Sequence, residues 1–254
     1  MIGQIVLRAM SRPIGADDYT KKHDQANLEG ALTILKGEFP DLRALVEGRK
    51  VLDFGCGAGA QSVALATKMN AIVTGIDINR GALKKAEKTA LKHGLSPSQC
   101  RFVCEPTTEK YDVIISQNAM EHFDDPASVL SLIHGNLMAG GKVLMTFSPP
   151  WLAPYGHHMN FFCKLPWLHL LFSEKTVMAV RSRYRNDGAK KYTEVTSGLN
   201  KMTLAKFEKL IKESGFIIKQ KRYRGVKGVA IFTRIPLLRE LLTDRVTCVL
   251  ETSQ

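Results

Sequence analysis

The sequence has few cysteines, no long apolar run and fewer acidic than basic residues. Its five cysteines are scattered without a Cys-x-x-Cys pair, which argues against a disulfide framework and against a zinc site. No apolar stretch approaches the roughly 18 residues that a membrane-spanning helix requires. The first ten residues lack the long apolar middle and the small-residue cleavage site of a signal peptide. We therefore expect a cytoplasmic protein without a bound metal.

Length and composition indicate an ordinary globular protein. The chain is long enough to bury a substantial core, and we expect a single domain over residues 1–254. Hydrophobic residues make up 44% and charged residues 24%, which excludes a disordered or fibrous chain. The formal net charge of +12 permits an anionic partner such as nucleic acid, phospholipid headgroups or a phosphorylated substrate. Charge alone does not choose among these partners.

A glycine-rich stretch organises the first half of the chain. A short apolar run ends in Asp53, and Gly55, Gly57 and Gly59 follow before a helix-forming run at residues 61–68. Glycines at this density let the backbone turn sharply from strand to helix and approach a ligand closely. We therefore expect a ligand-binding loop at the end of the first strand of an α/β sheet.

A second apolar run, residues 71–76, ends in Asp77, which lies 20 residues beyond Gly57. A doubly wound sheet places a carboxylate near this position to hold the hydroxyl groups of a ribose. Dinucleotide-binding folds use the spacing G-x-G-x-x-G, whereas this loop reads G-x-G-x-G with Asp53 at the strand end. A carboxylate there would repel a pyrophosphate but suit a cationic ligand. The pattern therefore disfavours a nicotinamide-dependent oxidoreductase.

Together these stretches resemble the first two motifs of the class I S-adenosylmethionine (SAM) methyltransferases. The resemblance covers about residues 49–148 and is to small-molecule members of the type 11 superfamily, such as those of ubiquinone and menaquinone biosynthesis. It implies an α/β, Rossmann-like, doubly wound sheet of seven strands, mostly parallel with an antiparallel last strand. It also implies SAM as the cofactor and transfer of its methyl group to an acceptor.

The resemblance divides the chain into four consecutive parts. They are a helical N-terminal cover (1–48), the SAM-binding core (49–150), a substrate cap inserted after strand five (151–200), and a C-terminal helix with a hairpin (201–254). The strands are expected at residues 51–54, 71–76, 101–104, 111–116, 142–147, 216–221 and 245–251. In the N-terminal cover, Tyr19 and His23 are either candidates for closing over the cofactor or ordinary surface residues.

The resemblance also assigns residues to the cofactor. The backbone of the glycine loop is expected near the methionine and ribose parts of SAM, with Asp53 near the amino group. Asp77 is expected on the ribose hydroxyls, Ile78 on adenine and Glu105 on the adenine amino group. The complete expected set, with the last three members at the methyl end, is Asp53, Gly55, Cys56, Gly57, Gly59, Asp77, Ile78, Glu105, Ser116, Gln117 and Asn118.

Two regions supply candidates for a general base. His122 follows the fourth strand, and the C-terminal strand ends of an open α/β sheet face the ligand, so this side chain could deprotonate a hydroxyl. The cap holds Tyr155, His157 and His158 among both tryptophans, a composition suited to a small-molecule pocket. The structural alternatives are local packing for His122 and a place on the rim of a hydrophobic cover for the cap histidines.

Two other interpretations compete with methylation of a small molecule. The stretch 148–151, Ser-Pro-Pro-Trp, resembles a motif of nucleic-acid methyltransferases that binds a flipped base. That motif follows the fourth strand, whereas residues 148–151 follow the fifth, so we disfavour a nucleic-acid substrate. A non-catalytic module that binds SAM without transferring the methyl group is the second alternative.

An apolar, aromatic stretch at residues 161–172 precedes a basic run at 181–191. This combination would allow docking on a membrane surface and suggests an amphiphilic acceptor, although a solvated basic loop is the alternative. We therefore expect O- or C-methylation of a small or amphiphilic metabolite of the lipid, quinone or sugar type. The protein is then cytoplasmic, with peripheral membrane contact as an option. The sequence leaves the oligomeric state open.

Overall fold

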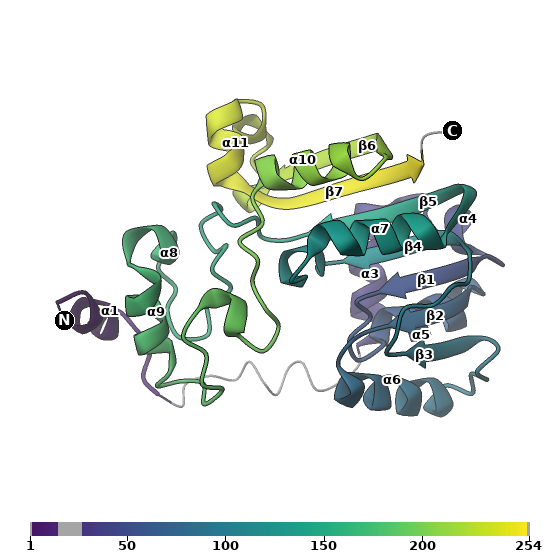
Figure 1. Ribbon diagram of the computed structural model, residues 1–254, viewed down its shortest axis with the longest axis horizontal. Helices are drawn as coiled ribbons and strands as arrows, with labels where there is room; N and C mark the ends of the chain where they lie inside the picture. The colour runs from purple at the N-terminus through teal and green to yellow at the C-terminus, as the bar shows by residue number, and fades with distance from the viewer. Residues whose placement is uncertain (1, 15–26, 253–254) are drawn as a thin grey trace.

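The computed structural model describes residues 2–14 and 27–252 (Figure 1), so Tyr19 and His23 lie outside the described residues. The strands are β1 (Lys50–Phe54), β2 (Ile72–Ile76), β3 (Cys100–Val103), β4 (Tyr111–Gln117), β5 (Leu137–Phe147), β6 (Phe216–Gly225) and β7 (Thr243–Thr252). The helices are α1 (Ile2–Ala9), α3 (Leu28–Glu38), α4 (Leu42–Val46), α5 (Ala60–Met69), α6 (Arg80–Lys92), α7 (Pro126–Asn136), α8 (Leu168–Leu171), α9 (Glu174–Arg181), α10 (Leu204–Glu213) and α11 (Pro236–Leu242).

The seven strands form one sheet in the order β3-β2-β1-β4-β5-β7-β6. Strands β1 to β5 pair in parallel, while β7 runs antiparallel to both β5 and β6. The predicted doubly wound, mostly parallel sheet with an antiparallel last strand is therefore confirmed. Strand β5 begins earlier than predicted because Leu137 already pairs with Tyr111 of β4.

Helix starts follow local capping signals in the sequence. Asn79 accepts a hydrogen bond from the backbone N–H of Ala82 at 3.0 Å and so begins α6. Asp125 caps α7, whose first residue, Pro126, lacks the N–H that a first helical turn leaves unpaired. These caps set where each helix leaves the carboxyl edge of the sheet, and hence where the connecting loops lie.

Helices cover both faces of the sheet. Helices α3, α4 and α5 share one hydrophobic cluster with the side chains of one sheet face, including Leu35, Leu65 and Val113. Helices α7 and α10 share another with the opposite face, including Leu130 and Phe207. The central strands are buried on both faces, which explains their nearly continuous apolar sequences.

The segment after β5 forms a cap with a hydrophobic cluster of its own. Phe162 and Val177 are fully buried in this cluster, and Leu7 of α1 belongs to it as well. Helix α1 therefore packs against α9 of the cap, and Figure 1 shows α1, α8 and α9 together at one end of the molecule. Within the described ranges, no helix combines the length and the apolar character needed to cross a bilayer.

Candidate active site

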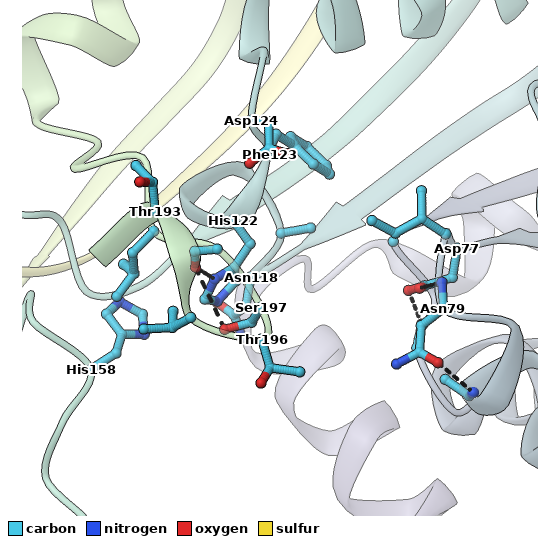
Figure 2. Close-up of a pocket in the computed structure, with 18 of the residues that line it drawn as sticks. Asp77, Asn79, Asn118, His122, Phe123, Asp124, His158, Thr193, Thr196 and Ser197 are labelled. Atoms are coloured by element: carbon cyan, nitrogen blue, oxygen red, sulfur yellow. Dashed lines mark hydrogen bonds between the residues drawn. The ribbon is translucent and has the colours of Figure 1, made fainter. Parts of the chain in front are cut away.

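A cleft of about 850 Å³ opens at the C-terminal ends of β1, β2 and β4, where the cap faces the sheet. This edge of a parallel sheet is where open α/β folds bind ligands. Figure 2 shows Asp77 and Asn79 on one side of the cleft, and His122, His158 and Ser197 on the other. The cleft is therefore bounded by the core on one side and partly by the cap on the other.

The glycine loop after β1 contributes bare backbone to this cleft. Gly57 has a φ of +53°, and a Cβ added there would meet nothing within 4 Å, because it would project into open space. Gly59 behaves differently, since a Cβ there would lie 2.5 Å from the Cβ of Ala86 in α6. Gly59 thus allows close packing of the loop on α6, whereas Gly57 leaves room for a ligand beside the backbone.

Asp77 joins the glycine loop to the second strand. One carboxylate oxygen accepts a hydrogen bond from the N–H of Gly57 at 2.8 Å, and the other accepts from the N–H of Asn79 at 2.8 Å. These two bonds fix the carboxylate in the lining of the cleft. The sequence separation of 20 residues between Asp77 and Gly57 therefore corresponds to a direct contact.

Asp53 lies beneath the glycine loop and is only 2% exposed. Its carboxylate accepts hydrogen bonds from Gln61 at 2.8 Å and from Ser62 at 2.5 Å, both in the first turns of α5. Burial raises the pKa of Asp53 to about 6, although these two hydrogen bonds act to lower it. In this structure the carboxylate anchors the start of α5 to the end of β1.

His122 lies in the short 3₁₀ helix Met120–His122 after β4 and lines the cleft. Its Nδ1 is 2.8 Å from the carbonyl oxygen of Gly198. A carbonyl can only accept, so Nδ1 carries a proton, and the lone pair of the unprotonated ring lies on Nε2. The ring of His158 meets that of His122 edge-on with centroids 5.3 Å apart. Desolvation and the neighbouring His122 lower the pKa of His158 to about 4, which keeps it neutral at pH 7.

Comparison with known proteins identifies a methyltransferase domain in this chain. A family model described as a methyltransferase domain matches residues 45–161. The ubiquinone biosynthesis O-methyltransferase of Pseudomonas syringae pv. tomato is 35% identical over 116 residues, which cover 44% of this chain and 50% of that protein. The chain thus spans about half the length of the curated relatives it matches.

Solved structures show the same fold. The magnesium protoporphyrin IX methyltransferase of Synechocystis, with bound SAH, has a TM-score of 0.56 at 16% identity and covers 95% of this chain and 90% of that chain. Phosphoethanolamine N-methyltransferase 2 of Haemonchus contortus has a TM-score of 0.57 at 16% identity, covering 89% of this chain and 53% of that chain. Residues 45–161 therefore match a methyltransferase domain, and the chain has the fold of the SAM-dependent methyltransferases.

SAM is the cofactor of this methyltransferase family, and the cleft offers groups that suit its parts. Asp77 presents a carboxylate that can accept hydrogen bonds from ribose hydroxyls. Ile78 is 92% exposed and offers an apolar surface to a flat base. The open space at Gly57, which a side chain would fill, allows close approach to the backbone. The residues present therefore fit the cofactor.

The structure brings some of the predicted site residues of the methyltransferase together and separates others. Those that line the cleft are Gly55, Gly57, Asp77, Ile78, Asn118, His122, His157 and His158. Those that do not line it are Asp53, Cys56, Gly59, Glu105, Ser116, Gln117 and Tyr155. Their contacts account for the separation.

Glu105 and Tyr155 are directed to solvent. The Glu105 side chain is 80% exposed and lies 3.6 Å from the guanidinium of Arg80, while Tyr155 is 37% exposed. Ser116 points instead into the sheet core, where it is fully buried. The Cys56 thiol packs beside β2, and burial raises its pKa. A position at a strand end therefore does not by itself place a side chain in the cleft, because successive side chains alternate between the faces of the sheet.

His157 lies deeper than the neighbouring His158. It is fully buried, and its Nδ1 accepts a hydrogen bond from the N–H of Met159 at 3.0 Å. Burial and the nearby His169 lower the pKa of His157 to about 3. This ring therefore supports the wall of the cleft as a neutral side chain.

Several lining residues were not predicted from the sequence. They include Asn79, Phe123, Asp124, Met159, Phe161, Arg181, Arg185, Asp187, Thr193, Thr196 and Ser197. Arg181 is buried and forms a two-bond ion pair with Asp187, with N–O distances of 2.7 and 2.5 Å. The hydroxyl-rich run 193–197 before α10 was the one visible signal in the sequence. In the described part of the chain, no cluster of three or more His, Cys, Asp or Glu side chains could hold a metal ion.

Proposed function

We propose that this protein transfers the methyl group of SAM to a small or amphiphilic acceptor, with O-methylation as the preferred chemistry. The observation that carries the proposal is the arrangement of the cleft, in which the Gly57–Asp77 pair faces His122 and His158. The name of the relative in ubiquinone biosynthesis supports a small-molecule acceptor. The cap, which supplies much of the lining, is the part that would select this acceptor.

Different residues of the chain bind different parts of the cofactor. Asp77 holds the ribose hydroxyls, Ile78 packs on the adenine, and the backbone at Gly57 lies beside the methionine part. When bound, SAM supplies an electrophilic methyl group on a sulfonium, so the protein has to align the acceptor and exclude water. Asn118, with a φ of +51°, lies in the lining beside His122 and borders the methyl end.

His122 acts as the general base for a hydroxyl acceptor. Its Nε2 lone pair takes the proton from the acceptor oxygen while that oxygen forms its bond to the methyl carbon. The electron pair of the broken carbon–sulfur bond stays on sulfur, and the proton stays on His122 until product leaves. His158 remains neutral and adds no positive charge beside the protonated base. A neutral amine acceptor, whose nitrogen already has a free lone pair, would not need this base for its attack on the methyl group.

Incubation with methyl-labelled SAM and a cell extract tests the proposed function. Label recovered in the organic or the aqueous metabolite fraction supports a small-molecule acceptor. Label in nucleic acid would overturn the proposal in favour of the Ser-Pro-Pro-Trp alternative. SAM binding without any transfer to extracts or to catechol and quinol acceptors would favour the non-catalytic module.

A charge reversal tests the cofactor site separately. Asp77→Lys should abolish SAM binding in a calorimetric titration, because the ribose would face an ammonium and the Gly57 N–H would lose its acceptor. Asp41→Lys is the matched control, since Asp41 is exposed beside α4 and does not line the cleft. Unchanged SAM affinity in Asp77→Lys would contradict the assignment.

We also propose peripheral contact between the cap and an anionic membrane surface, with the protein otherwise cytoplasmic. Helix α1 turns Leu7 inward and leaves an apolar face outward: Ile2 is 80% and Ile5 is 66% exposed. Leu171 of α8 is 63% exposed in the same part of the cap. A short helix with an outward apolar face is suited to the interface of a bilayer.

Basic residues lie on α1 and on the segments that contact it. Arg8 lies on α1, and exposed Lys164 and Lys175 lie in segments that contact α1. Residues 2–12 and 151–200 together contain nine Lys and Arg but three acidic residues. This charge complements acidic headgroups, which attract each nearby cation by about 1 kcal/mol.

Vesicle co-sedimentation tests the membrane contact. The protein should pellet with vesicles of phosphatidylcholine and phosphatidylglycerol, and less with phosphatidylcholine alone. Ile5→Glu should reduce the bound fraction several-fold, whereas Ile34→Glu, at a 47% exposed position on α3, should not. Equal binding of both variants would contradict the proposal. Self-association that only Ile5→Glu abolishes would instead assign the face to a second copy of the chain.

A further inference from the structure

The chain that leaves the cap wraps around the turn that carries His122. The side-chain NH₂ of Asn200 donates to the carbonyl oxygens of Met120 and Phe123, each at 2.8 Å. The backbone N–H of Asn200 donates to the carbonyl oxygen of Glu121 at 3.0 Å. Asn200 thus binds the carbonyl groups of three residues in or next to the short 3₁₀ helix after β4.

The orientation of the Asn200 amide follows from its partners. Both atoms facing the side chain are carbonyl oxygens, so only the NH₂ group can occupy that position. The amide oxygen is buried and has no hydrogen-bond partner among the described residues. An aspartate would present an oxygen to these carbonyls and could not form either bond.

The same loop also sets the tautomer of His122. Two residues before Asn200, the carbonyl oxygen of Gly198 lies 2.8 Å from Nδ1 of His122, which Figure 2 shows beside Ser197. Gly198 has a φ of +65°, and a Cβ there would lie 3.0 Å from the carbonyl oxygen of His122. The loop 198–200 therefore fits closely against the turn. It holds the proton on Nδ1, which leaves Nε2 as the nitrogen that can accept a proton.

We propose that Asn200 is a positioning residue, which holds the loop 198–200 on the turn 120–123 so that Gly198 fixes His122 with its Nε2 lone pair available. The kinetic part of this proposal rests on the proposed role of His122 as general base. Its structural part concerns only the tautomer of the ring and needs no acceptor. Because residues 198–200 continue from the cap, displacement of the cap would also release the base.

Two readouts test the proposal in the full-length protein. Nitrogen-15 NMR of the imidazole rings reports which ring nitrogen carries the proton, and His122→Gln identifies the His122 signals among the seven histidines. Wild type should show His122 as the Nδ1–H tautomer, and Asn200→Asp should show a mixture of tautomers. The same substitution should lower kcat by about 10- to 100-fold, because the base is then misplaced, with SAM affinity unchanged.

Asn136 provides a matched control. Its NH₂ group also donates to two carbonyl oxygens, those of Thr107 at 2.6 Å and Glu109 at 2.8 Å, but it lies outside the cleft. Asn136→Asp should destabilise the fold to a similar degree and leave both the His122 signal and kcat unchanged. If Asn200→Asp does not fold, Asn200→Ala removes the donors without adding charge.

Each result decides the question. An unchanged His122 tautomer in folded Asn200→Asp or Asn200→Ala overturns the proposal. An equal loss of kcat in Asn136→Asp also overturns it, because the effect would then reflect general destabilisation. If wild type transfers no methyl group to any acceptor, the proposed function fails, but the tautomer comparison still tests Asn200.

Discussion

Replacing Asp53 by asparagine should make the folded protein more stable. The pKa of Asp53 is raised from 3.8 to about 6 by burial, so holding the carboxylate ionised costs the folded state about 3 kcal/mol at pH 7.5. Asparagine is nearly isosteric and still accepts the hydrogen bond from Ser62. Gln61 can rotate its amide to keep the second bond. We therefore expect Asp53→Asn to gain up to about 3 kcal/mol in free energy of unfolding at that pH.

The gain should depend on pH in a defined direction. Because the folded pKa of Asp53 exceeds the unfolded value, the native state takes up the proton first as pH falls through about 6. The penalty on wild type then decreases and is lost below about pH 4. The advantage of Asp53→Asn should accordingly shrink to about 1.5 kcal/mol at pH 5.

Urea unfolding at pH 7.5 and pH 5 measures the difference in stability between Asp53→Asn and wild type. Titration with SAM measures the effect of the substitution on cofactor binding. Asp53 does not line the cleft, but removal of its negative charge beneath the glycine loop should weaken binding of the cationic cofactor about tenfold. Asp112→Asn is the control, because Asp112 accepts from the N–H of Lys50 at 2.9 Å, away from the cleft. If Asp53→Asn were less stable than wild type by the same amount at both pH values, the result would refute the conclusion that the buried Asp53 carboxylate destabilises the folded state.

Three further predictions concern other parts of the chain. Gly57→Ala and Gly48→Ala both place a side chain at positive φ, so each should lose about 1–2 kcal/mol of stability, but only Gly57→Ala should weaken SAM binding in a titration. Burial acts to raise the pKa of Glu38, but hydrogen bonds from Thr247 and from arginines lower it. The Glu38 carboxylate therefore stabilises the folded state at neutral pH, and this stabilisation is lost as the pH falls through its lowered pKa. Urea unfolding should show Glu38→Gln less stable by about 3 kcal/mol at pH 7, with the difference vanishing in acid. Burial lowers the pKa of His157 to about 3, so wild type should lose about 3 kcal/mol between pH 6.5 and pH 4 as the unfolded chain takes up a proton. If the free energy of unfolding of His157→Asn fell as steeply between pH 6.5 and pH 4 as that of wild type, the result would contradict this assignment.

Local patterns in the sequence were enough to predict the sheet and the loop that faces its edge. Strand β2 and the acid that ends it were recognised because an apolar run and a terminal carboxylate are features of neighbouring residues. The pairing of Asp77 with Gly57 agrees with the expected spacing, since a strand–helix–strand unit has a nearly constant length. Residues in this part of the cleft could therefore be listed before the fold was known.

The positions of single side chains could not be predicted in the same way. Asp53, Glu105 and Ser116 all stand near strand ends, yet one is buried under α5, one points to solvent and one faces the core. The direction of a side chain depends on the twist of its strand and on which helix packs over it. Neither is determined by the residues next to it in the chain.

The sequence by itself determined the order of strands and helices, the glycine loop and the two strand-terminal acids, because these depend on periodicity and backbone preference over a few residues. Only the tertiary structure decided that α1 joins the cap, that Gly198 reaches His122 and that Asn200 reaches the turn that carries His122. The contacts of Gly198 and Asn200 link residues 76 to 80 positions apart in the chain, and α1 lies still farther from the cap in sequence. They form because the cap folds back over the carboxyl edge of the sheet, and no short stretch of sequence specifies that meeting.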